Sequence, residues 1–186
     1  MNHWISSDWH LGHQRIMNIL RPEFNDIKVM NETILFNMFE NVRPGDQFYF
    51  LGDLIFTNYS WIETILNLIK DKRIHFHFIL GNHDKKIPKK FLNEFASVNH
   101  MKNIKINDQK ITLSHYPMIS WNCSHWGAWQ LYGHHHRQEH AGDIPELGKQ
   151  LNVNCEFHNF KPWNFEEIKE IMKNKKDNWN LIKKEE

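Results

Sequence analysis

The sequence has few cysteines, few glycines and prolines, little net charge and no long apolar run, and each shortage excludes a class of protein. Two cysteines, Cys123 and Cys155, among 186 residues are too few for a disulfide framework. Eight glycines and six prolines provide no flexible linker between domains. A net charge of +1 argues against a strongly basic surface for nucleic acid. No apolar segment approaches the roughly 20 residues that a membrane-spanning helix needs.

The chain length predicts a single domain over residues 1–186, because such a length is at the upper end of what one compact domain contains. Residues 173–186 are mostly charged, so we expect them to fray as a C-terminal tail. The first polar motif begins at Asp8, which leaves no room for a cleavable signal peptide. Two free thiols fit a reducing compartment. We therefore expect a cytoplasmic protein that does not associate with membranes.

Short apolar segments, each followed by a polar loop, recur along the chain. Alternating or continuous apolar residues predict strands at 3–6, 47–51, 73–80, 110–114, 130–132 and 150–153. Helical spacing of apolar residues predicts helices at 27–42, 61–70 and 164–172. In open α/β sheets, the loops at the carboxyl ends of strands converge and bind ligands. The polar loops are therefore the candidate functional residues.

Histidine is abundant, with 14 residues, and several histidines lie in those loops. Two pairs, Asp8 with His10 and His134 with His136, share an i, i+2 spacing that lets both side chains point the same way. Oxygen and imidazole donors without thiolates suit Mn²⁺, Fe, Zn²⁺, Co²⁺ or Ni²⁺. These two pairs, together with a lone carboxylate, an amide and another imidazole, give seven donors, more than one ion usually takes from protein, so two ions are expected. The polar residues in the loops are Asp8, His10, Asp53, Asn82, His83, Asp84, His115, His134 and His136.

The order of these motifs resembles the metallophosphoesterase, or calcineurin-like, superfamily along nearly the whole chain. The matching motifs are Asp8-x-His10, Gly52-Asp53, Gly81-Asn82-His83-Asp84, His115 and Gly133-His134-x-His136. Within the superfamily, the chain resembles small bacterial and phage members that have Ser-Asp-x-His-x-Gly-His near the start and Ser-His-Tyr-Pro before the last histidines. The resemblance implies an α/β fold, a four-layer α-β-β-α sandwich with two mixed sheets.

The resemblance also implies a role for each residue. One divalent metal would be held by Asp8, His10, Asp53 and His136, and a second by Asp53, Asn82, His115 and His134. Asp53 would bridge the two ions, for which Mn²⁺ is the expected metal and Fe, Zn²⁺, Ni²⁺ and Co²⁺ are alternatives. A hydroxide held between the ions would attack phosphorus, as two adjacent cations allow at neutral pH. His83 would be the general acid that protonates the leaving group.

One position departs from the protein serine/threonine phosphatases of the superfamily. Their Gly-Asp-x-x-Asp motif has an aspartate that orients the acid histidine, and Phe56 stands at that position here. This difference argues against a protein phosphatase. It leaves the orientation of His83 to Asp84 or to a backbone carbonyl.

Two further residues are candidates for substrate contacts. His13 belongs to the motif of the small relatives and could reach the substrate phosphate, or it is a surface histidine. Arg21, in an Arg-Pro-Glu-Phe segment, could clamp a phosphate with its guanidinium, or it forms a structural salt bridge.

The favoured function is hydrolysis of a small phosphate ester or a nucleotide-type substrate. The preference for a diester over a monoester comes from the resemblance and from no particular residue. A repair nuclease would need a capping domain and a basic surface that the chain lacks, so we expect no specific nucleic-acid binding. The alternative is a non-catalytic protein-binding scaffold, which this fold becomes when metal ligands are lost. The sequence leaves open whether the chain forms a homodimer.

Overall fold

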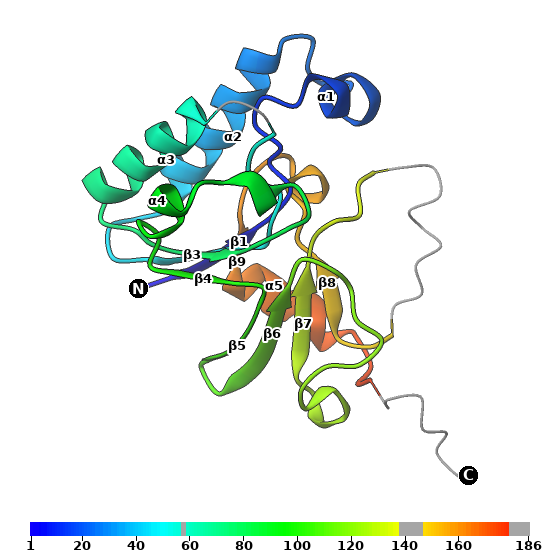
Figure 1. The fold of residues 1–186 in the computed structure, drawn as a ribbon. Coiled ribbons are helices and arrows are strands. Elements are labelled where there is room, and N and C mark those ends of the chain that lie inside the picture. The colour runs from blue at the N-terminus through cyan, green and yellow to red at the C-terminus, as the bar shows by residue number, and fades with distance from the viewer. Residues whose placement is uncertain (57–58, 138–146, 179–186) are drawn as a thin grey trace.

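A computed structural model describes residues 1–56, 59–137 and 147–178 and contains two mixed sheets (Figure 1). The first sheet has the order β4 (Ser97–Asn99), β3 (His75–Ile79), β2 (Gln47–Phe50), β1 (His3–Ser6) and β9 (Trp163–Asn164). The second has the order β5 (Met101–Ile106), β6 (Gln109–Ser114), β7 (Trp129–Tyr132) and β8 (Gln150–Asn152). Neighbouring strands are parallel except at β1–β9 and β5–β6. The predicted α/β fold with two mixed sheets is confirmed.

Except for α5 (Phe165–Lys173), the helices cover the first sheet on the side that faces away from the second sheet (Figure 1). The other α-helices are α1 (Gln14–Leu20), α2 (Ile27–Asn41), α3 (Ser60–Asp71) and α4 (Lys89–Leu92), and short 3₁₀ turns occur at Asp84–Lys86, Ser124–Trp126 and Cys155–His158. The side chain of Asp26 caps the start of α2 by accepting hydrogen bonds from the Lys28 and Val29 amides. A capping box of Asn164 and Glu167 fixes the start of α5. Local sequence therefore sets where these helices begin.

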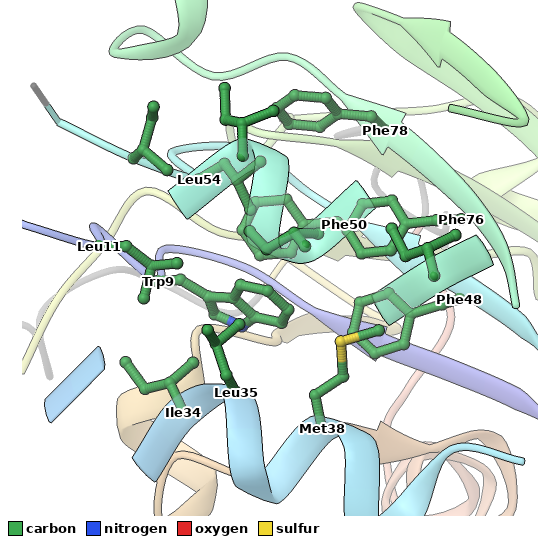
Figure 2. Close-up of a cluster of buried hydrophobic side chains, with 14 of the residues drawn as sticks. Trp9, Leu11, Ile34, Leu35, Met38, Phe48, Phe50, Leu54, Phe76 and Phe78 are labelled. Carbon is green, nitrogen blue, oxygen red and sulfur yellow. The ribbon is translucent and has the colours of Figure 1, made fainter. Parts of the chain in front are cut away.

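An aromatic core lies between the first sheet and helices α2 and α3 (Figure 2). Phe48 stacks on Phe76 with ring centroids 5.0 Å apart, and Trp9 lies 4.7 Å from Phe50. From α2, Met38 and its neighbours reach toward these rings (Figure 2). Because this core fixes β1, β2 and β3 relative to one another, it also fixes the loops at their carboxyl ends.

Removing one of the central rings should lower stability. We expect Phe76→Ala, at a position with no exposed surface, to reduce the free energy of unfolding by about 3–5 kcal/mol. Chemical denaturation monitored by circular dichroism measures this change. A loss below about 1 kcal/mol would contradict the view that the ring is central to the core.

A second core lies between the two sheets and includes α5. Tyr49 and Leu51 alternate with Phe48 and Phe50, so β2 presents apolar side chains to both of its faces. This explains why the segment is continuously apolar in the sequence. The second sheet contributes buried side chains such as Leu131, which has no exposed surface.

The predicted elements agree with the structure within a few residues. The sequence did not predict α1, α4, β4, β5 or β9, which are short or lack a clear apolar period. The expectation of a frayed tail from residue 173 onward is wrong for its first part. There the Asn178 side chain is buried and donates to the carbonyls of Ile119 and Leu147 at 2.8 and 2.5 Å. Residues 179–186 of that tail lie outside the described residues.

Among the residues that the structure describes, no helix is long and apolar enough to cross a lipid bilayer.

Candidate metal centre

The predicted ligands gather where the parallel strands of both sheets end. Asp8, Asp53 and Asn82 follow β1, β2 and β3, while His115 and His134 follow β6 and β7. The two sheets therefore contribute to one cluster of donors, and three overlapping groups of ligand atoms each lie within 4.8 Å of one another. These groups are Asp8, His10 and His136; His10, Asp53 and His83; and Asp53, His115 and His134.

Four of these residues have a left-handed backbone, which residues other than glycine rarely adopt. The φ angles are 57° at Asp8, 49° at His10, 60° at Asp53 and 71° at His134. Neighbouring loops hold this conformation, since the Asp8 amide donates to the Gly52 carbonyl at 2.9 Å and the His10 amide to the Asp53 carbonyl at 3.0 Å. Such strain persists only where the surroundings impose it, and it is typical of functional sites.

One end of the cluster brings Asp8, His10 and His136 together. The Nε2 atoms of His10 and His136 are 3.1 Å apart, and each lies 4.0 Å from Oδ1 of Asp8. Two ring nitrogens this close need a proton or a cation between them. The buried Asp8 carboxylate accepts from the His134 amide at 3.0 Å, and burial raises its pKa to about 6. This donor set fits a divalent cation.

Asp53 lies at the centre of the cluster. Its Oδ2 is 3.6 Å from Nε2 of His10 and 3.4 Å from Nε2 of His115. Its Oδ1 accepts the backbone amide of His83 at 2.9 Å. Burial would raise the pKa of Asp53, but hydrogen bonds, first of all with His115, lower it below its ordinary value. Asp53 therefore offers an ionised carboxylate to both ends of the cluster.

The other end contains His115, Asn82 and His134. His115 Nδ1 lies 2.8 Å from the Leu51 carbonyl, which can only accept a hydrogen bond. Nδ1 is therefore the donor, and the ring is oriented with Nε2 pointing into the cluster. That Nε2 lies 3.0 Å from Oδ1 of Asn82. Burial would lower the pKa of His115, but the contact with Asp53 and the charge of Asp8 raise it to about 9. Burial lowers the pKa of His134 to about 4.

Three glycines that precede ligands have no room for a side chain. A Cβ atom would lie 2.5 Å from Nδ1 of His115 at Gly52, 2.3 Å from Oδ1 of Asp53 at Gly81, and 2.4 Å from Oδ2 of Asp8 at Gly133. These glycines let the ligand side chains pass close to the neighbouring backbone.

His83 and Asp84 have different surroundings. The His83 side chain is 35% exposed and its Nε2 lies 3.9 Å from Oδ2 of Asp53. The Asp84 carboxylate is buried and accepts backbone amides from Asp53 at 2.7 Å, Leu54 at 2.9 Å and Gly81 at 2.8 Å. Asp84 therefore ties the loops after β2 and β3 together. The interpretation of Asp84 as the group that orients His83 is wrong, because its hydrogen bonds go to these amides and, among the described residues, none joins it to the His83 ring.

His13 lies beside the cluster and is largely buried. Its ring stacks on Phe56 with centroids 3.6 Å apart and lies 5.5 Å from His10 and 6.0 Å from His83. Its Nδ1 accepts the Ile16 amide at 3.3 Å and caps α1. Burial, together with the nearby His83, lowers the pKa of His13 to about 4. The interpretation of His13 as a surface histidine is wrong, while its contact with substrate stays a prediction.

Arg21 does not face the cluster. It has no exposed surface, and its Nε donates to Oε1 of Glu156 at 2.8 Å. The structure therefore contains the salt bridge, and the phosphate-clamp interpretation is wrong for this conformation. Glu156 in turn contacts Nδ1 of His136 at 2.7 Å. Burial would raise the pKa of Glu156, but the hydrogen bond with His136 and the charge of Arg21 lower it to about 2.

Sequence reasoning missed Glu156. One signal could have found it, because it follows a strand, β8, as the other polar residues of the cluster do. It carries no recognisable motif, and a lone glutamate after a strand is more often exposed.

A two-sheet α/β fold with aspartate, asparagine and histidine at the strand ends defines a class of metal-binding hydrolases. The sequence model of the calcineurin-like phosphoesterases matches residues 1–183, and the chain belongs to this family. It is therefore a phosphoester hydrolase of a metal-dependent family, and its Asp and His clusters can bind metal.

Several known proteins resemble the chain over most of its length. The uncharacterized protein MJ1445 of Methanocaldococcus jannaschii is 32% identical over 164 residues, which cover 86% of this chain and 84% of that protein. The Gene 66 protein of Mycobacterium phage L5 is 25% identical over 178 residues, which cover 76% of this chain and 86% of that protein. Among solved structures, the protein of unknown function AQ665 from Aquifex aeolicus has a TM-score of 0.70 at 25% identity, covering 91% and 98% of the two chains.

Proposed function

We propose that the protein is a dinuclear, Mn²⁺-dependent enzyme that hydrolyses phosphodiesters in preference to monoesters. The observation that carries the proposal is the central position of Asp53, whose Oδ2 lies within 3.6 Å of His10 on one side and 3.4 Å of His115 on the other. Asp8 and His136 complete the donor set on the side of His10. On the side of His115, the set is completed by Asn82 and His134.

Two adjacent cations would lower the pKa of a water held between them and neutralise the phosphate oxygens. The donor side chains of the chain would hold those cations. The backbone contacts of Asp8 and His10, together with the short distances around Asp53, hold these donors before any substrate arrives. Such preorganisation is the main way a protein accelerates phosphoryl transfer.

His83 is the residue best placed to protonate the leaving group. Its side chain is 35% exposed, whereas His10 and His115 are each 1% exposed. Its backbone amide is fixed by Oδ1 of Asp53, so the imidazole stays next to the centre. A histidine that is accessible and adjacent to the reacting phosphate is the common choice of general acid.

The buried position of Arg21 supports the preference for diesters. A phosphomonoester carries a second negative charge near neutral pH, and a guanidinium is the usual partner for it. Arg21, for which the sequence allowed either a phosphate clamp or a structural salt bridge, is paired with Glu156. A diester, with one negative charge, does not need that partner.

The experiment that tests the proposal compares two substrates on metal-stripped protein. Hydrolysis of bis-p-nitrophenyl phosphate and of p-nitrophenyl phosphate is measured before and after Mn²⁺ is added. We expect turnover only with metal and a higher kcat/KM for the diester. A higher value for the monoester would reject the diester preference. Absence of turnover with Mn²⁺, Zn²⁺, Co²⁺, Ni²⁺ or Fe²⁺ would favour the scaffold alternative.

Removing the acid should slow the reaction in a way that depends on the leaving group. We expect His83→Ala to lower kcat about 10²–10⁴-fold on a diester with an alkyl leaving group, which must be protonated. On the p-nitrophenyl diester the loss should be smaller, because p-nitrophenolate departs without a proton. His75→Ala is the matched control, since His75 is exposed at the other end of β3. Equal losses on both substrates would show that His83 is not the acid.

A further inference from the structure

Arg21 and Glu156 form an ion pair without solvent contact. Both side chains are 0% exposed, and Nε of Arg21 lies 2.8 Å from Oε1 of Glu156. Removing two charges from water is costly, and a buried pair persists only where further hydrogen bonds satisfy both partners. The remaining contacts of the pair therefore indicate what it holds in place.

Arg21 holds the loop that follows β1. Its NH1 group donates to the Trp9 carbonyl at 2.8 Å, and its NH2 group donates to the Asp8 carbonyl at 2.6 Å. These two carbonyls belong to the segment from Asp8 to His10, where the backbone is left-handed at both ends. Arg21 thus fixes a strained segment that carries two of the proposed ligands.

Glu156 holds the loop that follows β7. Its Oε1 lies 2.7 Å from Nδ1 of His136, and its Oε2 accepts the Arg137 amide at 3.0 Å. A carboxylate only accepts hydrogen bonds when ionised, so the proton of the His136 ring belongs on Nδ1. The lone pair of Nε2 then faces His10, 3.1 Å away.

We propose that Glu156 is a positioning residue that fixes the tautomer and orientation of His136, and that Arg21 couples it to the Asp8 loop. This inference rests on the proposed function. It concerns one metal position only, because His115 at the other position is oriented by the neutral carbonyl of Leu51. Carboxylates that hold a ligand histidine typically change metal affinity 10–100-fold when they are removed.

Two variants separate this role from a general loss of stability. Glu156→Gln leaves Arg21 buried without its counter-charge and can unfold the protein. Arg21→Met combined with Glu156→Leu removes both charges and the acceptor for the Nδ1 proton of His136, and it replaces the pair with apolar side chains of similar volume. Asp46→Asn is the matched control, because Asp46 is a buried carboxylate that accepts the Asn2 and Arg43 amides at the opposite end of the first sheet.

The test is a Mn²⁺ titration in which free Mn²⁺ is counted by electron paramagnetic resonance. We expect two sites in the unchanged protein and in Asp46→Asn. In the folded Glu156 variants, affinity at one site should fall about 10–100-fold while the other is retained. In a His136→Ala background, adding Glu156→Gln should change neither site further. Unchanged affinity in the Glu156 variants, or an equal loss in the His136→Ala background, would overturn the inference.

The tautomer provides a readout that needs no metal. We expect the nitrogen NMR shifts of His136 in the metal-free protein to show the Nδ1–H form, and the double variant to lose it. An Nδ1–H ring that persists without Glu156 would overturn the inference but not the proposed function. An unchanged protein that never binds two ions would overturn the proposed function, and this inference with it.

Discussion

Replacing Asp53 with asparagine should lower kcat/KM about 10³-fold or more and weaken both metal positions together. Oδ2 of Asp53 lies within 3.6 Å of a histidine ring nitrogen at each end of the cluster. This one substitution therefore removes a negative charge from both ends. Charge stabilisation by bound cations is worth several kcal/mol, and each 1.36 kcal/mol is a factor of ten in rate. Asparagine keeps the oxygen that accepts the His83 amide, so the fold should survive.

The measurement is diester hydrolysis across a range of Mn²⁺ concentrations, together with a thermal melt. Asp46→Asn is again the control, since Asp46 directly precedes β2 and Asp53 follows it, and both are 2% exposed. We expect the control to lose stability and keep its activity. If Asp53→Asn weakened only one of the two metal positions, Asp53 would not bridge them.

The sequence was informative about the ligands because each one follows a strand. Strand patterns are local, and parallel strands bring their carboxyl ends to the same edge, so Asp8, Asp53 and Asn82 could be expected to meet. The family resemblance then implied which ligands would bind each of the two metal ions. In both steps, the neighbouring residues in the sequence indicate where the ligand lies in the fold.

The groups that hold the ligands were not predictable in this way. Arg21 and Glu156 are 135 residues apart in the chain, and their pairing depends on how the end of α1 meets the 3₁₀ turn that follows β8. Asp84, which with a backbone carbonyl was one of two candidates for orienting its neighbour His83, accepts amides from the loop after β2 instead. Long-range hydrogen bonds of single charged residues leave no period or motif in a sequence.

The same distinction holds for the fold. The strand β2 was predicted because burial on both faces makes it continuously apolar. The strand β9 has only two residues, and it pairs with β1 from the other end of the chain. Its existence depends on tertiary contacts, and no local pattern indicates it.

Adding a methyl group at Gly133 should damage the metal centre although none of its ligands is mutated. The Cβ of Gly133→Ala would lie 2.4 Å from Oδ2 of Asp8 and 2.5 Å from Oγ of Ser7, and real Cβ atoms essentially never approach within 3.0 Å. The Asp8 carboxylate is buried with its backbone fixed by Gly52 and Arg21, so it cannot move away freely. It must leave its position near His10, and a shift of this kind can cost about 10²-fold in rate.

Gly45→Ala separates this effect from lost stability. Gly45 has a left-handed φ of 83° with open space around it, so alanine there adds about 1 kcal/mol of backbone strain at the opposite end of β2. Overpacking at Gly133 should cost about 1–3 kcal/mol, which is a comparable loss. We expect both variants to melt earlier, and only Gly133→Ala to lose Mn²⁺ affinity and about 10²-fold in kcat/KM. If the two variants lost activity equally, stability would explain the result, and the close approach of Gly133 to Asp8 would have no role in forming the metal centre.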